Sequence, residues 1–212
     1  MPRPAFLALA AALALVLSFI PAPTARAAAD DDGFTPLFNG KDLAGWVKPD
    51  DPNASFTVEN GEIVGRTVAL LKKNEFLCTE KPYADFVLKA KVKFLKGNSG
   101  IQFRSKRAPD GAVSGPQADV CDDCWGLFYE ERRRGVLEKH PDEVKGLIKK
   151  GDWNEFVITA KGDHVTIDIN GKRLTDRTDP MFDKTGIIAL QIHVWKEPME
   201  VRFKDIVIKC LD

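Results

Sequence analysis

A strict alternation of apolar and polar residues, in segments of strand length, constrains the fold more than any other feature. In residues 86–94 (FVLKAKVKF) every second residue is apolar, and Lys89, Lys91 and Lys93 occupy the positions between. Residues 165–169 repeat the pattern. A period of two places the apolar side chains on one face of an extended strand, so these segments predict half-buried β-strands.

Turn signals separate the strand-like segments. Asn-Gly pairs at residues 60–61 and 170–171 are typical of two-residue hairpins. Residues 186–195 and 199–211 read as two further strands. Only residues 130–150 could form a helix, and their proline and glycines predict a long irregular excursion instead. Short strands without long helices between them predict an antiparallel β-sandwich.

The amino terminus has the pattern of an export signal. Residues 6–20 form an apolar run of about fifteen residues, short of the roughly 20 that span a bilayer. Small residues follow at Ala25 and Ala27, as before a cleavage site. We expect residues 1–29 to be a signal peptide and residues 30–212 to form one domain, periplasmic or extracellular, without a stable membrane span. A retained membrane anchor is the alternative.

The charge balance restricts the class of partner. Lys+Arg and Asp+Glu number 31 each, which leaves no overall positive field to attract nucleic acid or an anionic membrane. A small polar molecule without net charge fits this balance better.

Four cysteines lie in the predicted exported domain, at positions 78, 121, 124 and 210. An even number in an oxidising compartment favours disulfides, and Cys121 with Cys124 is the obvious candidate pair. Free thiols, or a metal or redox centre, are the alternatives. A zinc site would need two more ligands, and the other cysteines and the histidines show no ligand spacing.

Three strand-like segments place amides beside charged or titratable groups on the face opposite their apolar residues. An ordinary solvated face would carry mostly Lys, Glu and Thr. Amides and carboxylates hydrogen-bond sugar hydroxyls, and an aromatic ring packs on the apolar face of a sugar. We therefore predict a sugar-binding cleft, with scattered surface residues as the alternative. The predicted residues are Gln102, Arg104, Gln117, Asp119, Gln191, His193 and Trp195.

Two adjacent glutamates follow the cysteine pair. Neighbouring side chains of a strand point to opposite sides, so one of Glu130 and Glu131 lines the cleft. Because Phe128 is the better core residue, Tyr129 and Glu131 are expected there, and a bulge would bring in Glu130 instead. Arg134, or another of residues 132–134, could hold the carboxylate or bind substrate, or belong to a basic turn.

The chain also resembles a known family. FTPLFNGKDLAGW, SGIQFRS, GPQADV, WGLFYEERRRG, GIIALQIHVW and VRFKDIVIKCL follow in order the landmarks of the 3-keto-disaccharide hydrolase domain, formerly domain of unknown function 1080, from Phe34 to Leu211. The resemblance implies a concanavalin A-like jelly roll acting on glycosides with a ketone at C3. Its recurrent polar positions match Arg104, Gln117, Asp119, Tyr129, one of the two glutamates, one of the three arginines and His193. The Cys121–Cys124 segment departs from the family pattern and suggests a local stabilising link.

A C3 ketone acidifies the C2 proton, so the C1 aglycone can leave by elimination, and water can add afterwards. This route needs a base, a group that stabilises the enolate and an acid. We assign these roles to His193, to Arg104 with Gln117, and to Glu131 or Glu130. In this assignment Asp119 and Trp195 hold the sugar.

Three alternatives remain at this stage. No cofactor is certain, but a divalent cation held by Asp119, Glu131 and His193 could replace Arg104. A non-catalytic carbohydrate-binding module is the rival function, because jelly rolls also serve as lectins. A structural or adhesion domain is the third, and it predicts neither sugar binding nor turnover.

Overall fold

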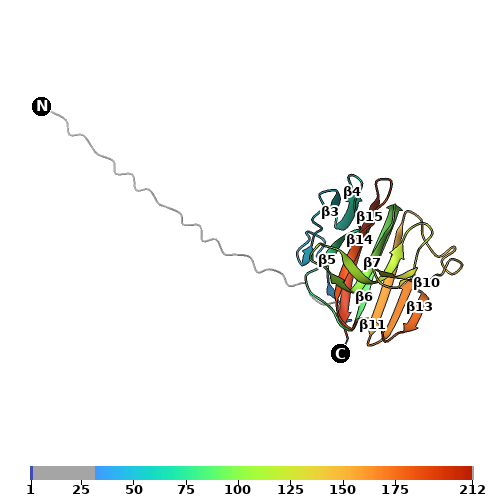
Figure 1. Ribbon diagram of the computed structural model, residues 1–212. Coiled ribbons are helices and arrows are strands. Elements are labelled where there is room, and N and C mark those ends of the chain that lie inside the picture. Colours follow the sequence, from blue (N-terminus) through green and yellow to red (C-terminus); the bar gives the residue numbers. More distant parts are fainter. Residues whose placement is uncertain (2–31, 212) are drawn as a thin grey trace.

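The computed structural model describes Met1 and residues 32–211 of the chain. The predicted signal peptide, residues 1–29, therefore lies outside the described residues apart from Met1. The described part consists of strands and turns, arranged as two antiparallel sheets (Figure 1). No helix in this part is long and apolar enough to cross a bilayer.

One sheet has eight strands. Its order is β13-β12-β11-β6-β15-β4-β3, and the short β1 pairs with β15. Strand β15 thus lies inside the sheet, between β6 and β4, although it is the last strand in sequence order. The strands are β1 Thr35–Pro36, β3 Ala54–Glu59, β4 Glu62–Thr67, β6 Phe86–Lys96, β11 Trp153–Lys161, β12 His164–Ile169, β13 Lys172–Thr178 and β15 Glu200–Cys210.

The other sheet has seven strands in the order β10-β9-β8-β7-β14-β5-β2. Its central strands β8, β7 and β14 come from different parts of the chain and lie side by side. The strands are β2 Trp46–Val47, β5 Glu75–Thr79, β7 Ser99–Arg107, β8 Val113–Val120, β9 Phe128–Glu131, β10 Gly135–Glu138 and β14 Ile187–Ile192.

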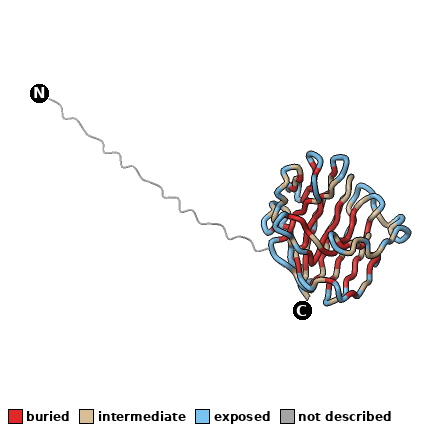
Figure 2. The backbone as a smooth tube through the Cα atoms, in the orientation of Figure 1, coloured by how far each residue is buried: buried red, intermediate tan, exposed pale blue. Residues whose placement is uncertain are grey.

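The apolar faces of the two sheets meet in one core. Alternate residues of β6, from Phe86 to Phe94, are buried in it, and Ile101 and Phe103 of β7 face them from the other sheet. Figure 2 shows the buried backbone concentrated in the strands and the exposed backbone in the connecting loops. The fold is therefore the predicted jelly-roll β-sandwich.

The predicted hairpins are present, and residues 130–150 contain no helix. Both Asn-Gly pairs have positive φ at both residues and join β3 to β4 and β12 to β13. Residues 130–150 finish β9, form β10 and continue as turns.

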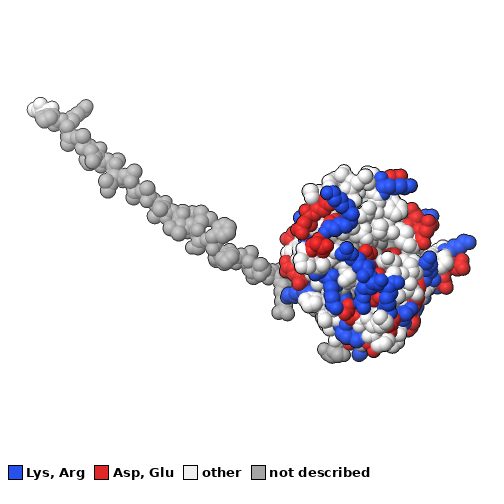
Figure 3. All heavy atoms as spheres, in the orientation of Figure 1, with Lys and Arg blue, Asp and Glu red and all other residues white. Residues whose placement is uncertain are grey.

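Acidic and basic side chains lie side by side on the surface. Figure 3 shows both signs on one face, with Lys and Arg gathered near its centre.

Candidate functional site

The candidate site lies on the face of the seven-stranded sheet that points away from the core. Strand register places Gln102 of β7 opposite Gln117 of β8, and Gln117 opposite Tyr129 of β9. Their neighbours Ile101, Ala118 and Phe128 point into the core. Alternation along three adjacent strands thus gathers the polar side chains on one face, as predicted.

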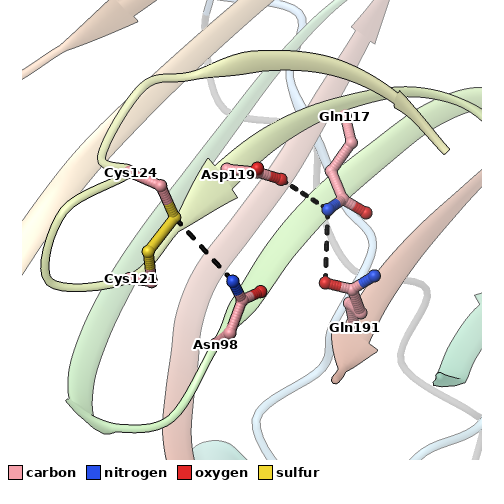
Figure 4. The surroundings of a disulfide bond; sticks show 6 residues. All are labelled: Asn98, Gln117, Asp119, Cys121, Cys124 and Gln191. Carbon is pink, nitrogen blue, oxygen red and sulfur yellow. Dashed lines mark hydrogen bonds between the residues drawn. A yellow bond between two sulfur atoms is a disulfide. The ribbon is translucent and has the colours of Figure 1, made fainter. Parts of the chain in front are cut away.

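Hydrogen bonds join five of the side chains on this face, and Gln102 and Tyr129 lie beside them. Nε2 of Gln117 donates to Oδ1 of Asp119 at 2.5 Å and to Oε1 of Gln191 at 3.2 Å (Figure 4). Nε2 of Gln191 lies 3.5 Å from Oε2 of Glu131. Nδ2 of Asn74 donates to the other oxygen of Glu131 at 3.3 Å. We call Asn74, Gln102, Gln117, Asp119, Tyr129, Glu131 and Gln191 the polar cluster.

His193 and Trp195 follow β14 at the rim of the polar cluster. The main-chain N–H of Val194 donates to Oδ1 of Asn74, which ties this segment to the cluster. Nδ1 of His193 lies 2.5 Å from the carbonyl oxygen of Val194, so Nδ1 carries the proton and Nε2 remains an acceptor. The Trp195 ring meets the His193 ring edge to face at 6.4 Å. The sequence predicted a strand over residues 186–195, with His193 inside it. Strand β14 instead ends at Ile192, so His193 lies just beyond the strand.

The environment of Asp119 changes its acidity. Its side chain is buried with 7% of its surface exposed. Burial raises the pKa of this carboxyl to about 7, against the lowering effect of the Gln117 amide, and the charge of Glu131 raises it further. Burial also raises the pKa of the Tyr129 hydroxyl, again assisted by Glu131. Asp119 can therefore give or take a proton near neutral pH.

The amides form a floor below these titratable groups. Gln102, Gln117 and Gln191 are almost fully buried, and both amide atoms of Gln102 and Oε1 of Gln117 have no hydrogen-bond partner. A Cβ on Gly100 would lie 2.7 Å from the Gln117 side chain, so the glycine makes room for that amide. Unpaired buried amides are costly, so these atoms are open to hydrogen bonds from a ligand or from water.

The hollow that reaches the cluster is small. It measures ≈60 Å³ and is lined by Asn74, Glu131 and Arg132 among others. Ligand pockets usually enclose about 300–1,000 Å³. The hollow is therefore smaller than a usual ligand pocket.

Arg104 does not belong to the cluster, and its prediction there was wrong. The register of β7 shifts between Gln102 and Lys106, and Arg104 has a φ of 45°, so simple alternation stops at this point. Its guanidinium is fully buried and donates to the carbonyls of residues 84, 162 and 183 and to Asp85 at 2.5 Å. Arg104 thus joins loops of both sheets.

Glu130 and Arg134 also lie elsewhere. Glu130 points to the same side as Phe128, is fully buried and accepts from Arg134 Nε at 2.5 Å. Arg134 also binds Asp179, and its guanidinium lies over the Phe182 ring. This ion-pair network holds the 130–134 turn and leaves Glu131 as the glutamate of the site, as alternation predicted.

The structure does not assemble the predicted cation site. No group of three or more His, Cys, Asp or Glu within residues 32–211 is arranged to hold a metal ion. Asp119, Glu131 and His193 are instead separated by the amides and by Asn74.

The disulfide lies next to the cluster. Cys121 and Cys124 are bonded in the turn between β8 and β9, two residues after Asp119 (Figure 4). Nδ2 of Asn98 lies 3.9 Å from the Cys124 sulfur, and the Asn98 carbonyl accepts from the N–H of His193. The disulfide therefore lies near both the strand that carries Asp119 and the segment that carries His193. Cys78 and Cys210 are free.

Sequence reasoning missed Asn74, Asn98 and Gly100. Asn74 precedes β5, and its partners Glu131 and Val194 are distant in sequence. No local pattern reports such a contact. Gly100 lies directly across from Asp119 in the sheet, and its role beside the Gln117 amide can be recognised only once the strand register is known.

Comparisons with known proteins agree with this fold. A family model described as the 3-keto-alpha-glucoside-1,2-lyase-like domain matches residues 33–209. A "putative glycosyl hydrolase" from Parabacteroides distasonis superimposes with a TM-score of 0.65 at 27% identity, covering 85% of this chain and 95% of that one. No curated protein matches the chain in sequence.

Two more distant structures share the fold alone. The carbohydrate binding module CBM66 from Bacillus subtilis has a TM-score of 0.55 at 17% identity, covering 78% of this chain and 95% of that one. A protein of unknown function with a galectin-like fold, also from Bacillus subtilis, has a TM-score of 0.61 at 9% identity, with coverages of 79% and 90%.

Proposed function

Because the chain belongs to the family of 3-keto-alpha-glucoside-1,2-lyase-like domains, we propose that it cleaves glycosides whose sugar ring carries a ketone at C3. The reaction is elimination of the C1 aglycone, with or without later hydration. The observation that carries this proposal is Asp119, a buried carboxyl with a pKa of about 7 bonded into a floor of amides.

The electron balance of the reaction defines the groups that are needed. A base removes the C2 proton, and the C2–H electrons form an enolate whose charge rests on the C3 oxygen. When the C3 carbonyl re-forms, the C1–O bond breaks and C1=C2 forms. The departing oxygen takes a proton from an acid. Addition of water, with OH at C1 and H at C2, completes a net hydrolysis.

The polar cluster and the residues at its rim offer a group for each role. Nε2 of His193 is the acceptor nitrogen and serves as the base. Asp119 serves as the acid, because a carboxyl with this pKa still carries its proton in much of the population at pH 7. Glu131 then binds sugar hydroxyls, so the roles expected for Asp119 and Glu131 are exchanged.

Amides replace Arg104 as the enolate-stabilising groups. Nε2 of Gln102 is buried without a partner on the same face as Gln117, so it can donate to the C3 oxygen. Trp195, 38% exposed at the rim, offers an aromatic surface to the sugar ring.

Incubation with 3-ketosucrose or 3-ketotrehalose in D₂O tests both activity and route. Elimination followed by hydration places deuterium at C2 of the released 3-keto sugar, whereas direct hydrolysis leaves that C–H bond intact. We expect Asp119→Asn and His193→Ala to reduce turnover about 100-fold or more. His164→Ala, which removes an exposed histidine far from the cluster in sequence, is the matched control.

Non-catalytic sugar binding is the second candidate function, supported by the fold shared with a carbohydrate-binding module. It predicts binding of the 3-keto sugar without release of the aglycone sugar, which is fructose from 3-ketosucrose and glucose from 3-ketotrehalose, and binding that survives His193→Ala. If the wild type releases the aglycone sugar no faster than the uncatalysed reaction while the 3-keto sugar still binds, the enzyme proposal fails. Turnover that is lost with EDTA and restored by a divalent ion would favour the cation-assisted version.

We also propose that residues 1–29 direct export. Expression of the full chain in a bacterial host, followed by cell fractionation and amino-terminal sequencing, tests this. A mature protein that starts near residue 30 outside the cytoplasm supports export, and an intact Met1 on cytoplasmic protein contradicts it.

A further inference from the structure

The outer face of the eight-stranded sheet has two adjoining hollows. One measures ≈400 Å³ and is lined by Lys91, Lys149, Trp153, Glu155 and Lys204, together with Asp152 and Asn170. The other measures ≈220 Å³ and is lined by residues that include Phe34, Lys89 and Asp205. Both contain Lys91 and Glu155, which are paired across β6 and β11. The hollows therefore adjoin along this pair of residues, and we call the two together the lysine groove.

An aromatic ring lies in each hollow, with lysines beside it. Nζ of Lys204 lies 4.2 Å from the centre of the Trp153 ring, and Nζ of Lys93 lies 5.9 Å from the same centre. Nζ of Lys89 lies 4.2 Å from the centre of the Phe34 ring. Both rings are half-buried and retain exposed surface. Ammonium groups held against aromatic rings are positioned to meet an anion beside an apolar surface.

Only one of the five lysines at the hollows forms an ion pair. Lys91 pairs with Asp205 at 2.8 Å. Four others form no ion pair within 4.0 Å among residues 32–211: Lys89, Lys149 and Lys204, which line the hollows, and Lys93 beside Trp153. Arg66 and Arg202 of the same sheet, in contrast, are paired. Ammonium groups without an ion pair can meet negative charge on a ligand.

Carboxylates in the same groove narrow the class of ligand. Four carboxylates lie among the lysines: Asp32, Asp152, Glu155 and Asp205. They would repel the closely spaced phosphates of a nucleic acid or the headgroups of an anionic bilayer. Carboxylates accept hydrogen bonds from sugar hydroxyls, and aromatic rings pack on the apolar faces of sugars. The mixture suits a ligand in which isolated acid groups alternate with hydroxyls.

We propose that the lysine groove binds an acidic oligosaccharide, in which carboxylate or sulfate groups meet the lysines and sugar rings pack near Trp153 and Phe34. The groove lies on the opposite sheet from the polar cluster, so it is a second site. The proposal is independent of the reaction at the first site.

Calorimetric titration of the folded chain tests the proposal with three hexasaccharides. Oligogalacturonate supplies carboxylates, chondroitin sulfate supplies sulfates as well, and maltohexaose is neutral. We expect one or both acidic ligands to bind more tightly than maltohexaose, and to bind more weakly as salt rises. The preferred ligand identifies the acid group.

Matched variants assign the binding to the groove. Lys204→Glu is expected to weaken binding of the acidic ligand about tenfold or more. The double variant Lys93→Glu with Lys204→Glu should weaken it further. Lys161→Glu makes the same charge change on an exposed lysine of β11 outside both hollows and should leave affinity nearly unchanged. Asp119→Asn should also leave it unchanged. Trp153→Ala tests the ring, and the surface lysine variants keep the test valid if that variant fails to fold.

Several outcomes would overturn the proposal. These are equal binding of maltohexaose, no binding of either acidic ligand, or the same loss with Lys161→Glu as with Lys204→Glu. Tighter binding of single-stranded DNA or of phosphatidylglycerol vesicles would point instead to a polyphosphate or membrane surface. Failure of acidic oligosaccharides to bind the lysine groove would not change the turnover measured in D₂O. The binding proposal and the proposed enzyme activity can therefore be rejected independently of each other.

Discussion

At the scale of single residues, the chemistry of the site depends on where each carboxyl is placed. Asp119 and Glu131 share a face, yet Asp119 is buried at 7% exposure while Glu131 is half-buried. Burial disfavours the charged form of Asp119, and the charge of Glu131 adds to this effect. Two like residues on neighbouring strands can thus take different roles.

Asp119→Asn is expected to change how stability depends on pH. The pKa of Asp119 rises from 3.8 in its ordinary state to about 7 in the fold, so the folded state holds a proton that the unfolded state has lost between these values. Stability of the wild type should therefore fall relative to the variant as pH rises from 4 to 7, by about 4 kcal/mol at most, and stay level above 7. Urea unfolding of both proteins across this range measures the difference. Parallel curves would show that Asp119 ionises normally.

Arg104→Met is expected to affect folding rather than catalysis. The substitution leaves three carbonyl acceptors and Asp85 without their buried partner, at a cost of about 3 kcal/mol or more. Arg107→Met, which removes an arginine paired with an exposed Asp50 at 3.6 Å, should cost less than about 1 kcal/mol. Denaturant unfolding gives both values. Normal stability of Arg104→Met with lost turnover of 3-keto sugar would restore the catalytic role for Arg104.

At the scale of strands, alternation predicted which side chains share a face but not where alternation stops. Gln117, Asp119, Tyr129, Glu131 and Gln191 follow a period of two, and all reach the predicted face. Arg104 does not, because a register shift and a positive φ after Gln102 are set by pairing with β8 and β14, which the sequence of β7 alone does not report. Local patterns therefore predict regular strands and fail at bulges.

The β8–β9 turn gives a prediction about its disulfide. The bonded cysteines are three residues apart, and the bond reduces the conformational entropy of the unfolded chain. In the chain-entropy account, a loop of this length adds about 2 kcal/mol to the free energy of unfolding. Reduction by dithiothreitol, or Cys121→Ser with Cys124→Ser, should lower the free energy of unfolding by about this amount and weaken sugar binding at the neighbouring Asp119. The reductant should have no effect on the double variant, which controls for Cys78 and Cys210. Unchanged stability and binding in both experiments would show that the bond does not support the site.

At the scale of the whole molecule, the order of strands in the sheets brings the functional residues together. The β-sandwich class could be predicted from short alternating segments and turns, and the resemblance to a family gave the jelly roll. Contacts such as that between Asn74 and Glu131 could not be predicted from the sequence, because they depend on the pairing of strands that are distant in the chain. The site is assembled from β5, β7, β8, β9 and β14, and only the complete sheet places them side by side.

This dependence on long-range pairing predicts the result of a carboxyl-terminal deletion. Strand β15 lies between β6 and β4 and also pairs with β1, so removal of residues 200–212 would separate the eight-stranded sheet into two parts. The deletion would also take core residues such as Val201 and Phe203 out of the sandwich. Burying an aliphatic or aromatic side chain contributes about 1.5–3 kcal/mol, and a domain is stable by only about 5–15 kcal/mol. The shortened chain should therefore show no cooperative thermal transition by circular dichroism. Replacement of the same strand's exposed Asp205 by Gly, which suits its φ of 51°, is the control and should retain the transition. A cooperative transition in the shortened chain would mean that the seven-stranded sheet can fold without its partner.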